Sequence, residues 1–419
     1  MKKPDEILSE FETKLQAISD VPSMIREIIN FVIVYGDCYG AKMEPLIDRG
    51  IKLSRGIGFE TGEVICYFNL AFFSGATGAT ALAKYDRTFP EIIELTNKLK
   101  GDDEWYPFAL SLMAYFHWFK GEYEKAFNII FECLKVLGGV HTQPQAWNYF
   151  ALGVFYFDTR DFENSKINFQ KAFDTFKMLN IEYGMARAAN GMGTIAILQN
   201  KPQEALPYLE FSADIYRKIG HYAGLSRAEN DMGMFEMANK NYVKAIQHLQ
   251  QSIQLRKEIG HIQGLITSYT ELGETYLRMR DHQKALEQFD LGMKLTIEAD
   301  SKQKRMRLHK LFYETYKELK NTDLALLNFE QFYEIKTQLM SDEAANNIKK
   351  VQTQFAKEKS ERDAEIERLK NIELKKAHDV IEQKNKDILD SIRYAKRIQT
   401  ALMANEKYID KSIERLMKK

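Results

Sequence analysis

The stretch ALGVFYFDTRDFENSKINFQKAF, residues 151–173, carries a pattern that the chain repeats. A glycine follows a large apolar residue, a small residue comes twelve positions later, and a bulky apolar residue comes four positions after that. In this stretch the three positions are Gly153, Ser165 and Phe169. The pattern recurs every forty residues, at Gly193, Ala205 and Leu209, at Gly233, Ala245 and Leu249, and at Gly273, Ala285 and Phe289.

The same alternation extends in both directions along the chain. A small residue on one helix lets its partner approach closely, and a large residue fills the space beside it, so the alternation is typical of paired helices. The sequence therefore predicts an all-α protein of stacked helical hairpins. The frame continues downstream at Tyr313, Ala325 and Phe329, and upstream, one residue short, at Ala114, Ala126 and Ile130.

In spacing and residue types these six units resemble the tetratricopeptide repeat, whose usual unit has about 34 residues. The additional residues fall in the links between units, where Gly184, Gly224 and Gly264 recur. The resemblance implies a superhelical solenoid. We expect a capping helix over residues 1–21, two degenerate units over 22–100, six units over 101–340, and a coiled-coil signalling helix over 341–419.

Composition narrows the class of partner. The 59 basic and 59 acidic residues cancel, so no net field directs the protein to nucleic acid or to a membrane surface. The longest apolar run, residues 28–36, is too short to span a bilayer, and the acidic N-terminal segment does not resemble a signal peptide. Cys38, Cys66 and Cys133 are far apart, which predicts reduced, buried thiols in a cytoplasmic protein.

The resemblance places the first helix of each hairpin on the concave face. Aromatic residues there would anchor a peptide, asparagine amides would pair with its backbone, and arginine would bind a carboxylate. The alternative is that the asparagines and aromatics serve packing between neighbouring hairpins. The predicted groove for a peptide or protein consists of Trp118, Trp147, Phe150, Phe157, Arg187, Asn190, Arg227 and Asn230.

No cluster of residues in the sequence predicts catalysis. Neither C-x-x-C nor H-E-x-x-H occurs, so we expect no metal and no cofactor. His221 and His261 are forty residues apart, but both fall in links between units. We find no pairing of nucleophile and base, and we expect that the chain is not an enzyme.

The C-terminal segment reads as a long helix with an apolar seam. From Ile381 onward, a heptad frame predicts a two-stranded coiled coil and hence a homodimer. A solvated single helix, or a tail folded back on the groove, is the alternative. The predicted dimer contacts are Ile381, Asn385, Ile388, Ile392, Ala395, Leu402 and Ile409.

The stretch KNKDILDSIRYAKRIQTAL, residues 384–402, resembles the helix upstream of SpoIIE-like, metal-dependent Ser/Thr phosphatase domains. The resemblance implies a sensor and regulatory module that relays to such a domain, either in the same polypeptide or in a partner. No segment of this chain resembles the phosphatase domain itself. A stand-alone adaptor dimer without a switch and a truncated phosphatase are the two alternative interpretations.

Overall fold

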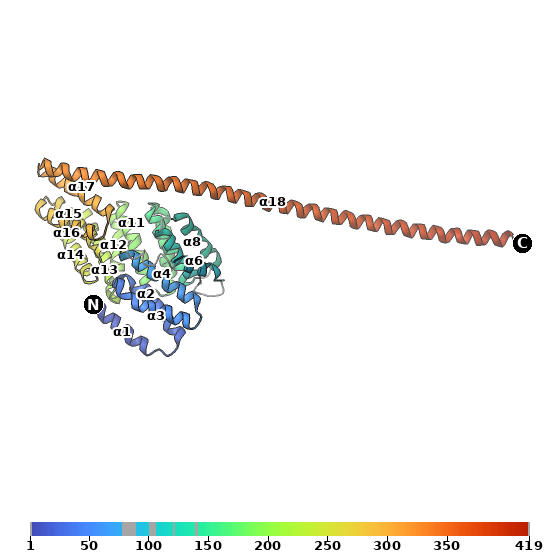
Figure 1. Cartoon of the computed structure of the whole chain (residues 1–419), viewed down its shortest axis with the longest axis horizontal. Helices are drawn as coiled ribbons and strands as arrows, with labels where there is room; N and C mark the ends of the chain where they lie inside the picture. Colours follow the sequence, from blue (N-terminus) through green and yellow to red (C-terminus); the bar gives the residue numbers. More distant parts are fainter. Residues whose placement is uncertain (1, 78–88, 100–105, 120–121, 139–140, 418–419) are drawn as a thin grey trace. The chain divides into compact units, whose positions relative to one another are not determined.

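The computed structural model describes residues 2–77, 89–99, 106–119, 122–138 and 141–417. Within these ranges the chain is helical and no strand occurs. It divides into two compact units, Met1–Lys336 and Thr337–Lys419. The N-terminal helices in Figure 1 are α1 (Pro4–Gln16), α2 (Val21–Tyr39), the 3-10 turn η1 (Gly40–Met43), α3 (Glu44–Gly56), α4 (Glu60–Thr77) and α6 (Phe89–Lys98).

The repeated hairpins follow in chain order. The first helix of each hairpin packs on the first helix of the next, so these helices form one inner layer. The hairpins are α7 (Tyr106–Phe119) with α8 (Tyr123–Leu137), α9 (Gln143–Asp158) with α10 (Phe162–Met178), α11 (Glu182–Leu198) with α12 (Pro202–Ile219), α13 (Tyr222–Ala238) with α14 (Tyr242–Glu258), and α15 (Ile262–Arg278) with α16 (His282–Glu298). The array continues with α17 (Lys302–Glu318) and α18 (Thr322–Met417).

Helix ends recur every twenty residues, which produces the forty-residue period. One residue at each link has a positive φ, between 44° and 71°, from Arg160 to Lys320. A left-handed residue ends an α-helix because its carbonyl can no longer continue the ladder. Glycine, asparagine and aspartate adopt this conformation most easily, and they occupy five of the nine positions, Asn180, Asn200, Gly220, Gly260 and Asp300.

The recurring glycines permit close contact between the two helices of a hairpin. A Cβ atom on Gly273 would lie 2.4 Å from the Phe289 ring, and one on Gly193 would lie 2.7 Å from Leu209. In the hairpin of α9 and α10, the Ser165 hydroxyl donates to the Gly153 carbonyl at 2.7 Å. The predicted fold class, a tetratricopeptide-type helical solenoid, is confirmed.

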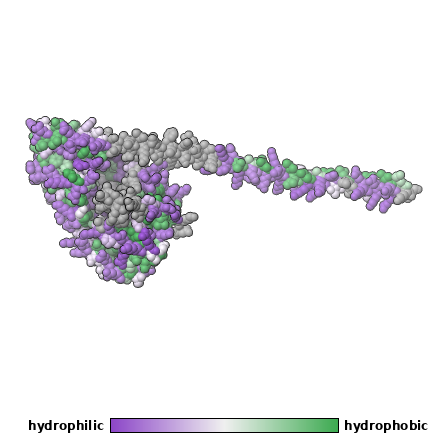
Figure 2. Space-filling view, viewed as in Figure 1, coloured by the Kyte–Doolittle hydropathy of each residue, from purple (hydrophilic) through white to green (hydrophobic). Residues whose placement is uncertain are grey.

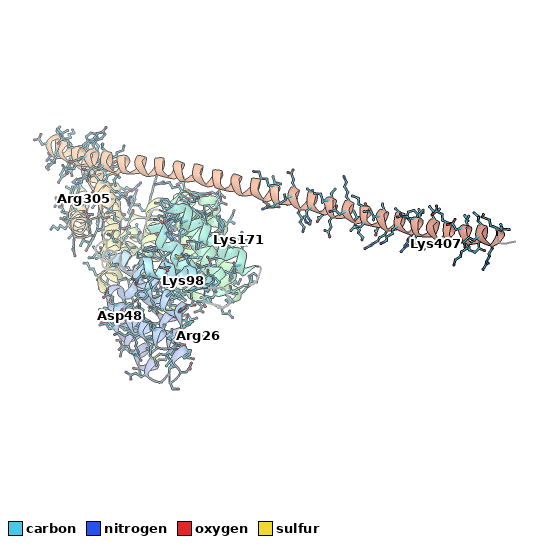
Figure 3. All side chains as sticks on the ribbon, turned by 45° about the vertical axis from the view of Figure 1, so that its right-hand side comes forward. Arg26, Asp48, Lys98, Lys171, Arg305 and Lys407 are labelled. Atoms are coloured by element: carbon cyan, nitrogen blue, oxygen red, sulfur yellow. The ribbon has the colours of Figure 1, made fainter. Side chains whose placement is uncertain are left out.

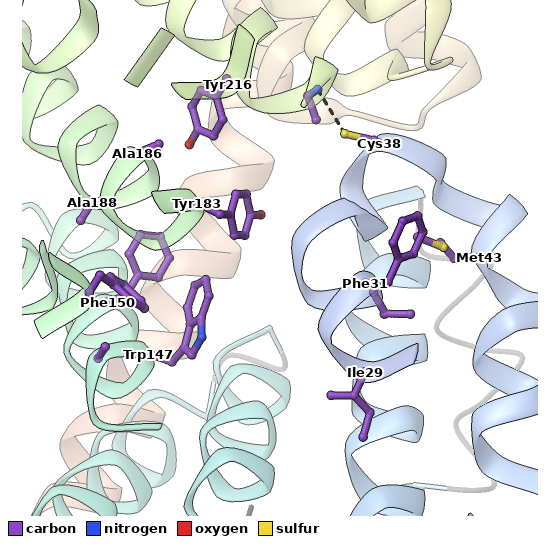
Figure 4. Packing of buried hydrophobic residues seen from close by; sticks show 14 of the residues in the cluster. Ile29, Phe31, Cys38, Met43, Trp147, Phe150, Tyr183, Ala186, Ala188 and Tyr216 are labelled. Carbon is purple, nitrogen blue, oxygen red and sulfur yellow. Dashed lines mark hydrogen bonds between the residues drawn. The ribbon is translucent and has the colours of Figure 1, made fainter. Parts of the chain in front are cut away.

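Helix α2 packs against the repeat helices that lie about 185 residues later. The Tyr35 hydroxyl donates to the Ile219 carbonyl at 2.9 Å, and the Ala223 amide contacts the Cys38 sulfur at 3.5 Å. In Figure 4, Trp147 and Tyr183 point from α9 and α11 towards α2. Part of the inner layer therefore faces α2 rather than solvent.

In the second unit, the described residues 337–417 are the continuing part of α18. Over residues 368–402 every side chain is exposed, and Figure 3 shows them projecting from all sides of the helix. Green apolar and purple polar atoms alternate along this part of the helix in Figure 2. Among the described helices, none combines the length and hydrophobicity that a membrane crossing needs.

Candidate ligand site on the inner layer

A cavity of about 50 Å³ lies where the inner layer faces the N-terminal helices. A single water needs roughly 10–15 Å³ on this measure, so the cavity has room for a few atoms. Helices α2, α4, α7, α9 and α11 all contribute to its walls. The lining residues are Ile33, Asp37, Asn69, Phe108, Ser111, Leu112, Tyr115, Trp147, Tyr183 and Arg187.

Arg187 sits among aromatic rings at one wall of the cavity. Its guanidinium carbon lies 4.6 Å from the Phe150 ring centre and 5.7 Å from the ring centres of both Trp147 and Tyr183. Its guanidinium makes a long hydrogen bond of 3.4 Å to the Tyr183 hydroxyl, and its buried Nε has no acceptor among the described residues. No carboxylate of the described residues lies within ion-pairing distance of it. The guanidinium group is therefore available to bind an anionic ligand.

Asp37 supplies the opposite charge from α2. Its Oδ1 lies 3.1 Å from His221 Nε2. Burial alone would raise the pKa of Asp37, but the hydrogen bond from His221 and the charges of Arg187 and Arg227 outweigh it and hold the pKa below its ordinary value. Asp37 is therefore ionised at neutral pH, and the cavity has one charge of each sign in its walls.

The side chains of Asp37, Cys38 and His221 lie close enough together that they could, by distance alone, bind a metal ion. His221 Nδ1 accepts the Gly224 amide at 2.8 Å and so carries no proton. Its proton then lies on Nε2, which donates to the Val34 carbonyl at 2.6 Å. A metal on Nε2 would require the opposite tautomer and would break the cap of α13. The cluster thus holds α2 against α13 and does not fit metal ligation.

The structure brings together three of the eight predicted groove residues. Trp147, Phe150 and Arg187 form one contact group beside the cavity. Trp118 lies elsewhere, buried with its ring stacked on Phe155 at 4.2 Å and its Nε1 donating to Asp158 at 2.9 Å. Phe157 is half-buried and packs on another phenylalanine of the same hairpin.

The two predicted asparagines are engaged within the fold. Asn190 donates to the Asp231 carboxylate at 2.8 Å, and Asn230 accepts from the Ser268 hydroxyl at 2.8 Å. These contacts join neighbouring units, as the packing alternative expects. Arg227, by contrast, is exposed on α13, and its charge lowers the pKa of Asp37.

Sequence reasoning missed Asp37, Asn69 and Ser111 because they lie outside the marker positions of the repeat. Tyr183 had a usable signal, since it precedes Arg187 by one helical turn. On α18 the seven predicted dimer residues are all exposed in the single chain, with Ile388 at 56% and Leu402 at 59%. An exposed apolar seam is compatible with pairing, and pairing itself stays a prediction.

Comparison with known proteins places these repeats in a family. Models described as tetratricopeptide repeat match residues 224–296 and residues 148–175. The chain carries tetratricopeptide repeats. A search of curated proteins returned no match.

Two solved structures share the tetratricopeptide architecture. One is a Rap protein complexed with competence and sporulation factor, 13% identical, with a TM-score of 0.55 over 77% of this chain and 99% of that chain. The other is a signal transduction ATPase with a tetratricopeptide repeat sensor from Pyrococcus horikoshii, 16% identical, with a TM-score of 0.50 over 77% of this chain and 50% of that chain. At these identities the likeness concerns the fold alone.

Proposed function

We propose that this chain is a non-catalytic regulatory module whose repeats bind a peptide or protein on their inner layer. The observation that carries the proposal is an exposed cation on the inner layer, since Arg227 lies on α13 and makes no ion pair with a described residue. The planar guanidinium group of an exposed arginine can bind a carboxylate of a partner through two hydrogen bonds. The repeat architecture and the Rap complex, which contains a bound factor, support the same function.

The C-terminal helix serves as the relay in this proposal. Two copies of α18 pair through the exposed seam that includes Ile388, Ile392 and Leu402. The paired helices then set the arrangement of an output domain, a SpoIIE-like phosphatase in the same polypeptide or in a partner. A bound ligand changes that arrangement only if it binds the two pairing states with different affinity.

Partner capture with the full chain tests the binding step. Arg227→Glu reverses an exposed charge beside the inner wall, and Lys177→Glu is the matched control, because Lys177 is an exposed cation on α10. The proposal expects one partner that is recovered by the wild type and by the Lys177 variant and is reduced about tenfold by Arg227→Glu. Equal recovery of the partner by all three proteins would contradict the proposal that the inner layer is the binding surface.

The relay step has its own readout. Adding the captured partner should shift the monomer–dimer equilibrium of the full chain, measured by sedimentation at several concentrations. If the monomer–dimer equilibrium does not change at a saturating concentration of the partner, the chain binds its partner but does not relay the binding through α18.

A further inference from the structure

The cavity between α2 and the inner layer is lined by hydrogen-bond donors from some helices and by acceptors from others. Donors come from the repeat helices: Arg187 from α11, and the Nε1 of Trp147 from α9. Trp147 is only 6% exposed, and its Nε1 has no acceptor. A buried indole N–H without a partner costs about 1–3 kcal/mol, so its position at a cavity wall favours a bound acceptor.

Acceptors come from α2, α4 and α7. Asn69 and Ser111 are buried and donate their own protons to helix carbonyl groups, Ile65 at 2.9 Å and Pro107 at 2.8 Å. Their oxygen atoms therefore remain as acceptors on α4 and α7. The ionised carboxylate of Asp37 adds a negative charge from α2.

Arg187 and Asp37 line the same cavity but make no ion pair with each other. Each influences the pKa of the other, so the two charges are close, yet their atoms lie beyond the 4 Å of an ion pair. The space between them has the size of a few atoms. A ligand that fills it must carry an anionic group on one side and a cationic group on the other.

We propose that this cavity binds a free α-amino acid with a small side chain. Its carboxylate accepts from Arg187 and Trp147, and its ammonium group donates to Asp37. The small apolar side chain lies against Ile33 and Leu112, the two aliphatic residues of the lining. A single amino acid fits this pair of charges better than a peptide, because the ammonium and carboxylate groups of a peptide lie on different residues and are further apart.

This site is separate from the proposed partner surface around Arg227. The amino acid would occupy the cavity between α2 and the inner layer, whereas the partner would bind the exposed surface around Arg227. If the chain binds an amino acid but captures no partner, this inference is supported and the proposed function is contradicted. If the chain captures a partner but binds no amino acid, the proposed function is supported and this inference is contradicted.

Titration of the full chain with L-alanine tests the inference, followed by tryptophan fluorescence and by calorimetry. Saturable binding is expected with a Kd at or below about 1 mM. N-acetyl-L-alanine lacks the ammonium charge and L-alaninamide lacks the carboxylate, so each should bind at least about tenfold more weakly. Trialanine should not compete. No saturation by L-alanine, glycine or L-serine up to about 10 mM, or equal binding of a capped analogue, would overturn the proposal.

Two variants assign the charges. Arg187→Met should abolish the preference for L-alanine over L-alaninamide, and Asp37→Asn should abolish the preference for L-alanine over N-acetyl-L-alanine. Because Asp37 also contacts His221, the ratio between ligands is the readout and not stability. Arg305→Met is the control, since Arg305 also has an unpaired buried Nε but does not line this cavity. Equal loss of L-alanine binding in the Arg305 and Arg187 variants would contradict the assignment.

Discussion

Replacing Gly273 by alanine adds one methyl group at the contact between α15 and α16. The new Cβ would lie 2.4 and 2.5 Å from two ring atoms of Phe289 and 3.1 Å from the carbonyl oxygen of Ala285. Phe289 is fully buried, so its ring has no solvent-exposed space into which to move. Overpacking of this kind costs about 1–3 kcal/mol, and the better helix propensity of alanine offsets about 0.5–1 kcal/mol. We predict that Gly273→Ala lowers the free energy of unfolding by about 1–2 kcal/mol.

Gly292 on α16 provides the matched control. A Cβ there would meet Leu308 at 3.4 Å and other atoms at 3.7 Å, which is ordinary contact. Gly292→Ala should therefore raise stability by about 0.5–1 kcal/mol. Urea unfolding followed by circular dichroism gives the global value, and hydrogen exchange of α15 and α16 gives the local one, since a repeat array need not unfold in one step. A Gly273→Ala protein as stable as the wild type would refute the argument that this glycine sets the helix spacing.

Three further predictions concern the tail, the N-terminal helices and pH. The double variant Ile388→Asn, Ile392→Asn should reduce the mass in light scattering from dimer to monomer, whereas the exposed control Lys386→Asn should leave it unchanged; a monomeric wild type would remove the coiled coil. Tyr35→Phe loses the bond to α12 and should cost about 0.5–1.5 kcal/mol, seen as faster hydrogen exchange in α2, and unaltered exchange would mean that this bond does not hold α2. Burial lowers the pKa of His261, which caps α15 through Nδ1, to about 4. The unfolded chain binds this proton from about pH 6.5 and the folded chain does not, so stability should fall by about 1–2 kcal/mol between pH 7.5 and pH 5. His261→Asn keeps a cap without a titrating group and should lose this pH dependence; an identical pH profile would contradict the assignment.

The hairpins were predictable because their determinants are local. The glycine, the small residue and the large residue meet within one hairpin, as the Gly153 carbonyl and the Ser165 hydroxyl illustrate. The twenty-residue spacing of left-handed links adds a second local signal that continues to Lys320. The spacing in the sequence therefore predicts both which helices pair in a hairpin and how long each helix is.

The candidate site was predictable only in part, because its second wall comes from far along the chain. The register of α2 depends on contacts such as Tyr35 with Ile219, which no periodicity in residues 21–39 encodes. The position of Trp118 in its unit predicts that it lies in the groove. Its actual environment depends on Asp158, forty residues away, which satisfies its N–H and lets the ring pack inside. The same dependence on a neighbouring unit applies to Asn190 and Asp231.

A photo-crosslinking amino acid at position 227 tests most directly whether the inner layer is a binding surface. The full chain would carry the probe at position 227 on α13 or, as a control, at position 177 on α10, both exposed. The account predicts a discrete adduct with one partner from position 227 and none from position 177. Adducts of equal yield from both positions, or none from position 227 when the partner is present, would contradict it.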